Sequence, residues 1–300
     1  MPPCSCPPGV AWREALVGIV LLWEVREAKW NDTLRESRGG IMSVEDERRS
    51  EERPVRVSAS PVELEGTLGV PEGARGVVLF AHGTGSGRLS PSNRHVAGLL
   101  RRAGLTTLLI DLLTPQEGEV DLRTGRLRFD IGLLTWRLIG ASRWLEDQPE
   151  TGNLRIGYFG ASTGAGAALV AAAERPEVVG AVVSRGGRPD LAGEALSRVE
   201  APTLLIVGGK DVPVIAMNEE ALGMLHTEKR LEIVPGATHL FEEPGALEGV
   251  SRLAAGWFVR HLAPNERQQP DHLSDTGANA ERPRSDPVVD GNHGALSPGQ

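Results

Sequence analysis

Between residues 76 and 234 the chain repeats one pattern, a short apolar run followed by a stretch with helical periodicity. The runs are rich in Val, Ile and Leu and nearly free of polar residues, which is typical of parallel strands covered on both faces. This alternation predicts an α/β domain with a mostly parallel sheet. The predicted buried strands are Gly76–Ala81, Thr106–Ile110, Arg155–Phe159, Val178–Ser184, Thr203–Val207 and Arg230–Val234.

Helical patterns separate and follow these strands. In the segment Ile131–Asp147, apolar side chains from Leu134 to Leu145 fall on one stripe of the helix. Two earlier runs, Val55–Ala59 and Val62–Leu68, alternate polar and apolar residues, which predicts antiparallel strands at an edge of the sheet. The predicted helices are Pro91–Ala103, Ile131–Asp147, Thr163–Glu174, Val214–His226 and Pro244–His261.

Composition divides the chain into three zones. Residues 54–263 carry the α/β pattern, and we expect them to form one domain. Residues 1–53 end in a charge-dense stretch, which predicts a poorly ordered extension. The alternative is that translation naturally starts at Met42 and that the residues before it are not part of the native protein. Residues 264–300 lack aromatic residues and apolar periodicity, which predicts a disordered tail.

Charge and cysteine content exclude several classes of partner. The formal net charge is −8, which argues against nucleic acid, because a polyanion requires a basic face. The longest apolar run near the N-terminus is Ala15–Trp23, well short of the roughly 20 residues that span a bilayer. The only cysteines are Cys4 and Cys6, so we expect no zinc site. These observations predict a cytoplasmic protein without metal, cofactor or membrane contact.

The motif that carries chemistry is Gly160-Ala-Ser-Thr-Gly164. It follows the predicted strand LRIGYF directly and opens an Ala-rich helix. In that context the pattern G-x-S-x-G is a nucleophile elbow, a strained turn that exposes a serine. The sequence therefore predicts Ser162 as a nucleophile. The alternative is a tight turn in which Ser162 caps the helix.

The same glycines allow a second interpretation. The spacing of Gly160, Gly164 and Gly166 also matches the loop of short-chain dehydrogenases. Those enzymes need a Tyr-x-x-x-Lys pair, but the only tyrosine is Tyr158, and Ser162 stands four positions later. The dehydrogenase interpretation is therefore excluded.

A nucleophilic serine requires a base, because a free hydroxyl is not ionised at neutral pH. His239 lies just past the last predicted strand, and Asp211 follows the strand before it. The order Ser, Asp, His is that of an α/β-hydrolase triad, and each residue follows a different strand at its carboxyl end. Two alternatives remain open: Asp211 only caps a helix, or Asp111, after the strand LLI, supplies the acid.

Acyl transfer also needs N–H donors for the oxyanion. We expect one from Thr163, directly after the nucleophile, and one from the loop HGTGSG at 82–87, at Thr84 or its neighbour Gly83. The same loop could instead bind phosphate, but it lacks the GK[ST] ending of a P-loop.

Two arginines follow the strand next to the nucleophile strand. At this position Arg185 and Arg188 are candidate contacts for a carboxylate or phosphate on the substrate. The alternative is a local ion pair with Asp190 or Glu194.

Taken together, the segments HGTGSG, GYFGASTGAGAAL, TLLIVGGKD and VPGATHLFEEP, over about residues 60–263, resemble the dienelactone hydrolase-like branch of the α/β-hydrolases. They are most similar to bacterial hydrolase domains that are sometimes fused to a phosphoribosyltransferase, although no phosphoribosyltransferase motif is visible in this chain. The resemblance implies a three-layer α/β-hydrolase fold with helices on both faces of the sheet. It also implies esterase-type chemistry, with Ser162 where dienelactone hydrolase itself has cysteine.

From Ser184 to Thr203 the chain has room for a loop and one short helix, so we expect no cap domain and an open site. The acidic loop Gln116–Asp130 is expected to form one wall. The predicted function is a serine hydrolase that cleaves a small soluble ester, lactone or thioester. The alternatives are acyl transfer or perhydrolysis by the same triad, and an inactive interaction module with this fold.

Overall fold

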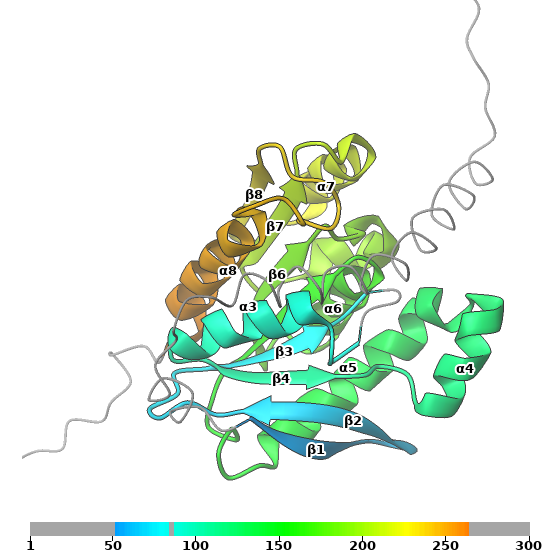
Figure 1. Ribbon diagram of the computed structural model, residues 1–300, viewed down its shortest axis with the longest axis vertical. Helices are drawn as coiled ribbons and strands as arrows, with labels where there is room; N and C mark the ends of the chain where they lie inside the picture. The colour runs from blue at the N-terminus through cyan, green and yellow to red at the C-terminus, as the bar shows by residue number, and fades with distance from the viewer. Residues whose placement is uncertain (1–51, 84–86, 264–300) are drawn as a thin grey trace, which may run out of the picture. The chain divides into compact units, whose positions relative to one another are not determined.

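The computed structural model describes residues 52–83 and 87–263. Their core is an eight-stranded sheet in the order β1-β2-β4-β3-β5-β6-β7-β8 (Figure 1). β1 and β2 form an antiparallel hairpin and β2 pairs antiparallel with β4, whereas the six strands from β3 to β8 are all parallel to one another. The strands are β1 (Glu52–Ala59), β2 (Val62–Gly69), β3 (Val77–Ala81), β4 (Thr106–Ile110), β5 (Ile156–Ala161), β6 (Val179–Arg185), β7 (Thr203–Gly208) and β8 (Lys229–Val234).

Helices cover both faces of the sheet and complete three layers (Figure 1). α3 packs beside α8 on one face, and α5 packs beside α6 on the other. The helices are α3 (Pro91–Arg102), α4 (Pro115–Thr124), α5 (Ile131–Glu146), α6 (Thr163–Glu174), α7 (Val212–Met224) and α8 (Ala246–Leu262), with the 3-10 helices η1 (Leu127–Phe129) and η2 (Pro189–Arg198).

The apolar core lies on both sides of the sheet, because successive strand side chains point to opposite faces. In β3, Val77 and Leu79 pack toward α5 and α6, while Val78 and Phe80 pack toward α3 and α8. All five side chains of this strand are buried. Such double coverage explains why the central strands have near-continuous apolar sequences.

The predicted fold class is confirmed, and every predicted strand and helix is present within a few residues of its expected ends. The stripe from Leu134 to Leu145 is buried in α5. β1 begins at Glu52, and the last helix ends at Leu262. The predicted extension and tail otherwise fall outside the described residues.

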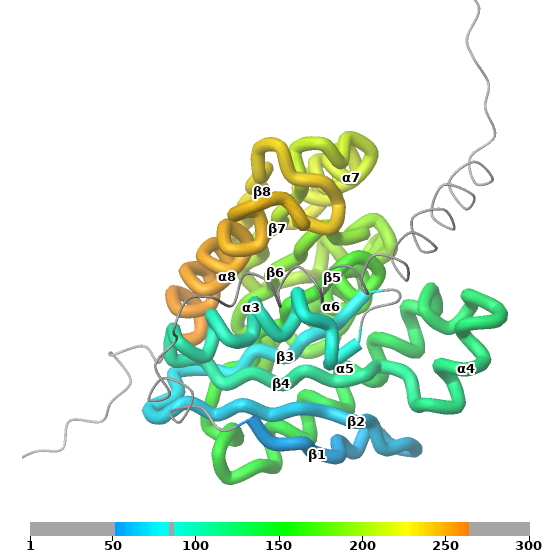
Figure 2. The backbone as a smooth tube through the Cα atoms, in the orientation of Figure 1, coloured from blue at the N-terminus to red at the C-terminus, as the bar shows by residue number. Residues whose placement is uncertain are grey.

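Two predictions were wrong: one about the burial of the last strand, and one about the secondary structure of the acidic segment. The strand predicted at Arg230–Val234 is not covered on both faces, because β8 is the edge strand and its side chains are exposed or half-buried. The acidic segment Gln116–Asp130 is not a loop but forms most of α4, and then η1. Thr114 and Glu117 form a capping box at the start of α4, and Pro115 occupies the first turn. Figure 2 shows this segment standing to one side of the sheet after β4.

The absence of a cap domain is confirmed for the segment between β6 and β7, all of which is described: it forms only the short η2. The carboxyl ends of the parallel strands therefore carry no inserted helical layer at this point. Within the described residues, no helix has both the length and the apolar character that a membrane span requires.

Candidate active site

Ser162 lies at the sharp turn between β5 and α6. Its backbone angles are φ 49° and ψ −123°, a conformation that costs a non-glycine residue about 1–3 kcal/mol. Its carbonyl accepts hydrogen bonds from the N–H of Ala165 at 3.1 Å and of Arg188 at 3.0 Å, which hold the turn in place. Its hydroxyl makes no capping hydrogen bond to the described residues of α6, so capping does not explain why serine stands here.

The flanking glycines are required by close packing. A Cβ atom on Gly160 would lie 2.4 Å from Ala165 Cα, and one on Gly164 would lie 2.2 Å from Ala81 O. Neither gap admits a methyl group, since real Cβ contacts are almost never below 3.0 Å. The G-x-S-x-G pattern is therefore a steric condition for bringing the helix this close to β3 and β5.

Asp211 and His239 are joined by a short hydrogen bond. Asp211 Oδ2 lies 2.6 Å from His239 Nδ1, and the two side chains are 13% and 21% exposed. Since Nδ1 is committed to the carboxylate, Nε2 is the nitrogen left to exchange a proton with a second group. Asp211 stands at the N-cap of α7 but makes no capping hydrogen bond to that described helix, so its carboxylate serves the imidazole instead.

The turn that carries His239 is held by its own polar contacts. Both carboxylate oxygens of Glu243 lie 3.0 Å from the N–H of Thr238, which donates to them. Burial raises the pKa of Glu243, but the hydrogen bonds from Thr238 and from its own N–H outweigh burial and lower it. Phe241 adopts a positive φ of 57° and is fully buried under the turn. These contacts fix the backbone on both sides of the imidazole.

One segment lies between Ser162 and His239. The N–H of Ser162 donates to Arg185 O at 3.4 Å, at the carboxyl end of the neighbouring strand β6. A Cβ atom on the next residue, Gly186, would lie 3.1 Å from His239 O and 3.5 Å from His239 Cε1. The predicted nucleophile therefore borders Arg185, and the predicted base borders the next residue, Gly186.

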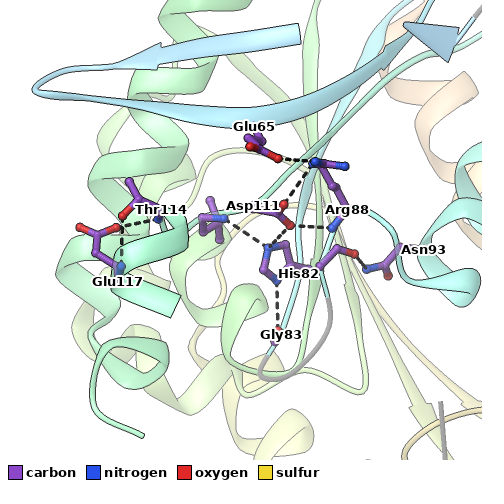
Figure 3. A network of polar contacts seen from close by, with 10 residues as sticks. Glu65, His82, Gly83, Arg88, Asn93, Asp111, Thr114 and Glu117 are labelled. Carbon is purple, nitrogen blue, oxygen red and sulfur yellow. Dashed lines mark hydrogen bonds and ion pairs between the residues drawn. The ribbon is translucent and has the colours of Figure 1, made fainter. Parts of the chain in front are cut away.

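Asp111, the rival acid, is engaged elsewhere. Its Oδ1 accepts the N–H of Arg88 at 2.8 Å, and its Oδ2 lies 3.1 Å from Arg88 Nε (Figure 3). The same Oδ1 lies 3.6 Å from His82 Nε2. Asp111, which directly follows β4, thus binds residues of the loop between β3 and α3, whereas His239 is bonded to Asp211.

The two arginines differ in their surroundings. Arg188 makes the local ion pair that the sequence allowed, with Nε 2.8 Å and Nη2 2.6 Å from the two carboxylate oxygens of Asp190. Arg185 is 5% exposed, and its Nε and Nη1 have no hydrogen-bond partner among the described residues. Its guanidinium carbon lies 6.0 Å from the centre of the Phe241 ring. Burial lowers the pKa of Arg185 to about 10, which leaves it charged at neutral pH.

Of the predicted oxyanion donors, Thr84 lies outside the described residues. Thr163 is the first residue of α6 and is buried. Gly83 is in contact with the nucleophile turn, because a Cβ atom on it would lie 2.7 Å from both Ser162 Cβ and Ala161 O. Two of the predicted donor residues therefore lie next to Ser162: Thr163 follows it in the chain, and Gly83 packs against its turn.

The polar network around His82 was missed in the sequence (Figure 3). A signal was available, since His82 directly follows β3 and Asp111 directly follows β4. Parallel neighbours bring their carboxyl ends together, but that β3 and β4 are neighbours follows only from the sheet order.

Comparison with known proteins assigns this arrangement to a family. The model of the dienelactone hydrolase family matches residues 64–257, most of the described chain. The chain belongs to the dienelactone hydrolase family. A relative from Mycobacterium tuberculosis, named as a putative phosphoribosyl transferase, is 55% identical over 208 residues. Those residues cover 69% of this chain but 46% of the relative, so the chain spans about half the length of that curated protein.

Solved structures of family members and more distant proteins share the architecture. A dienelactone hydrolase from Anabaena variabilis is 65% identical, with a TM-score of 0.70, and the match covers 71% of this chain and 99% of that one. The protein Est1E from Butyrivibrio proteoclasticus is 13% identical, with a TM-score of 0.59 and coverage of 69% and 98%, a likeness of fold alone. The chain has the α/β-hydrolase fold, and its family supports hydrolase chemistry.

Proposed function

We propose that this protein is a serine hydrolase that cleaves a small ester, lactone or thioester through an acyl-enzyme on Ser162. The observation that carries the proposal is the 2.6 Å contact between Asp211 Oδ2 and His239 Nδ1. The strained turn of Ser162 lies nearby, because Ser162 contacts Arg185 and His239 contacts the next residue, Gly186. A hydrogen-bonded carboxylate keeps the imidazole in the tautomer whose Nε2 can accept a proton. Membership of a hydrolase family supports the same reaction class.

In the proposed reaction, His239 Nε2 takes the proton of Ser162 Oγ while Oγ attacks the carbonyl carbon. The carbonyl oxygen becomes an oxyanion, held by the N–H of Thr163 and by a second N–H at Thr84 or Gly83. His239 then gives the proton to the leaving alcohol or thiol, and the acyl group stays on Oγ. Water, deprotonated by the same imidazole, attacks the acyl carbon. The bond from this carbon to Oγ then breaks, the acid leaves, and His239 returns the proton to Oγ, which regenerates the free serine.

The size of the substrate follows from the missing cap. Because only η2 separates β6 from β7, no helical lid covers the strand ends at that point of the described chain. An open site buries little of a long acyl chain, so we propose a small, water-soluble substrate. A cytoplasmic location belongs to the same proposal, supported by an N-terminal apolar run too short to span a bilayer.

The direct test is covalent labelling with a fluorophosphonate, which phosphonylates activated serines. We expect stoichiometric labelling of the native protein, located at Ser162 by peptide mass spectrometry, and no labelling after denaturation, because activation requires the folded triad. Ser197, a serine hydrogen-bonded at the surface, is the internal control and should stay unmodified. A native protein that resists the probe would be an inactive module with this fold, and the proposal would fail.

We further propose that Arg185, rather than Arg188, contacts an anionic group of the substrate. A buried guanidinium without an acceptor is costly, and a carboxylate would satisfy it with strong charge-assisted hydrogen bonds. The Arg185 carbonyl accepts the N–H of Ser162, and the Arg185 guanidinium carbon lies 6.0 Å from the centre of the Phe241 ring, two residues past His239. These two contacts support a place for the anionic group near the proposed triad. Arg188 is already neutralised by Asp190.

Arg185→Met is expected to change preference between two methyl esters that differ only in the group at the far end of the acyl chain. Methyl hydrogen succinate carries a carboxylate where methyl butyrate carries a methyl group. We expect the ratio of their kcat/KM values, measured by pH-stat, to fall by about 10- to 100-fold in Arg185→Met, the value of a hydrogen bond to a charged group. Arg188→Met should change the ratio by less than about threefold, as expected for an exposed ion pair. An unchanged ratio in Arg185→Met would remove Arg185 from the substrate site.

A further inference from the structure

Asn218 is a fully buried polar residue in the middle of α7. The buried side chains of this helix are those of Val214, Asn218 and Ala221, which share one face because they are three or four residues apart. Asparagine is a poor helix former, and a buried amide is costly unless it is hydrogen-bonded. Packing alone would favour an apolar side chain here, so the reason for an asparagine lies in its hydrogen bonds.

The amide nitrogen of Asn218 joins two backbone carbonyls. Nδ2 lies 2.8 Å from Val214 O, one turn earlier in α7, and 3.1 Å from Gly187 O. Gly187 belongs to residues 185–188, which lead from the end of β6 into η2 and are called here the 185–188 segment. A carbonyl can only accept, so the nitrogen and not the oxygen of the amide must face both. Each of its two protons serves one carbonyl, and together they tie α7 to the 185–188 segment.

The 185–188 segment holds the nucleophile turn from two sides. The carbonyl of Arg185 accepts the N–H of Ser162 at 3.4 Å, and the N–H of Arg188 donates to the carbonyl of Ser162 at 3.0 Å. Gly187 lies between these two contacts in the chain. A shift of Gly187 would therefore disturb both hydrogen bonds to the backbone of Ser162.

The same segment also borders the proposed base. A Cβ atom on Gly186 would lie 3.1 Å from His239 O, so this glycine packs directly against the turn of His239. α7 begins directly after Asp211, whose carboxylate lies 2.6 Å from His239 Nδ1. Asn218 therefore connects the helix that follows the proposed acid with the segment that lies between the nucleophile and the base.

We propose that Asn218 is a positioning residue for the reaction: it fixes the 185–188 segment against α7 and thereby places Ser162 beside the proposed base. This inference rests on the proposed hydrolase function and adds a residue to it. Because Asn218 is fully buried, it acts through the backbone and does not touch the substrate. Its contribution should appear in kcat, since attack depends on the alignment of Oγ with the imidazole, and not in KM.

Two substitutions remove the hydrogen bond to Gly187 in different ways. Leucine has the branched shape of asparagine and a higher helix propensity but no donor, so Asn218→Leu loses both hydrogen bonds. A serine inside a helix donates to the carbonyl four residues earlier, so Asn218→Ser keeps the bond to Val214 and loses the bond to Gly187. Ala221→Gly is the matched control, because it weakens the same face of α7 and leaves both hydrogen bonds in place.

We expect both Asn218 variants to lower kcat for a short-chain nitrophenyl ester by about 10- to 100-fold, with KM within about threefold of the wild-type value. The two variants should differ in melting temperature, because serine leaves a cavity that leucine fills, and yet share the loss of kcat. Ala221→Gly should keep kcat within about twofold of wild type although its melting temperature falls. The measurements are kcat and KM, beside thermal unfolding followed by circular dichroism.

Wild-type kcat in Asn218→Leu, or kcat values that follow the melting temperature across the three variants, would overturn the positioning role. If the Asn218 variants unfold at the assay temperature, the rate of fluorophosphonate labelling is compared at a lower temperature where circular dichroism shows them to be folded. Variants that fold at no temperature would show that Asn218 serves the fold itself, which would also overturn the proposal. Failure of the proposed function is a different result, because the wild-type protein itself would then neither turn over esters nor react at Ser162.

Discussion

Replacing Ser162 by alanine is expected to abolish turnover of short-chain nitrophenyl esters, with kcat falling by at least about 10⁴-fold. The substitution removes only the hydroxyl. The hydrogen bonds that hold Ser162 in the fold are made by its backbone N–H and carbonyl, and these remain. Ala at the same φ of 49° has the same backbone strain, so the free energy of unfolding should change by less than about 1 kcal/mol. The measurement is kcat under saturating ester, beside a urea unfolding curve.

Ser162→Gly is the matched control for strain. Glycine adopts a positive φ without penalty, so this variant should be as inactive as Ser162→Ala but more stable than it by about 1 kcal/mol. Inactivity together with higher stability would show that the turn is held in a strained conformation for the sake of the hydroxyl. Full retention of ester turnover in either variant would refute the assignment of Ser162.

The framework was predictable because it depends on local chemistry. Parallel strands buried on both faces require apolar runs, so both ends of the strand Thr106–Ile110 could be predicted without error. The turn at Ser162 requires glycines at fixed positions, since Gly160 and Gly164 touch Ala165 and Ala81. Where a motif is a steric condition of this kind, sequence and structure carry the same information.

Contacts that depend on sheet order were not predictable in the same way. That His82 meets Asp111 follows from β3 and β4 lying side by side, and the exposure of β8 follows from its place at the edge. The unpaired state of Arg185, against the paired state of Arg188, depends on side-chain directions that no local pattern specifies. α4 was a different case, because its capping box from Thr114 to Glu117 is a local signal that was overlooked.

Asp211→Asn is expected to lower kcat/KM for the same esters by about 10⁴-fold while the fold stays intact. The reason is the tautomer of His239. The carboxylate can only accept, so it holds the proton on Nδ1 and leaves a lone pair on Nε2 for the serine. An asparagine amide can donate to Nδ1, which moves the proton to Nε2 and blocks the base. Loss of the charge also removes the stabilisation of the imidazolium that forms in the transition state.

The same substitution at the rival carboxylate decides between the two candidates. In Asp111→Asn the amide oxygen can still accept the N–H of Arg88, so the loop between β3 and α3 keeps this attachment. We therefore expect kcat/KM to fall by no more than about 10-fold. Asp190→Asn, which only releases Arg188 at the surface, should be neutral within about twofold. If Asp111→Asn were inactive and Asp211→Asn were not, the acid would have to act from β4, and the hydrogen bond between Asp211 and His239 would be structural.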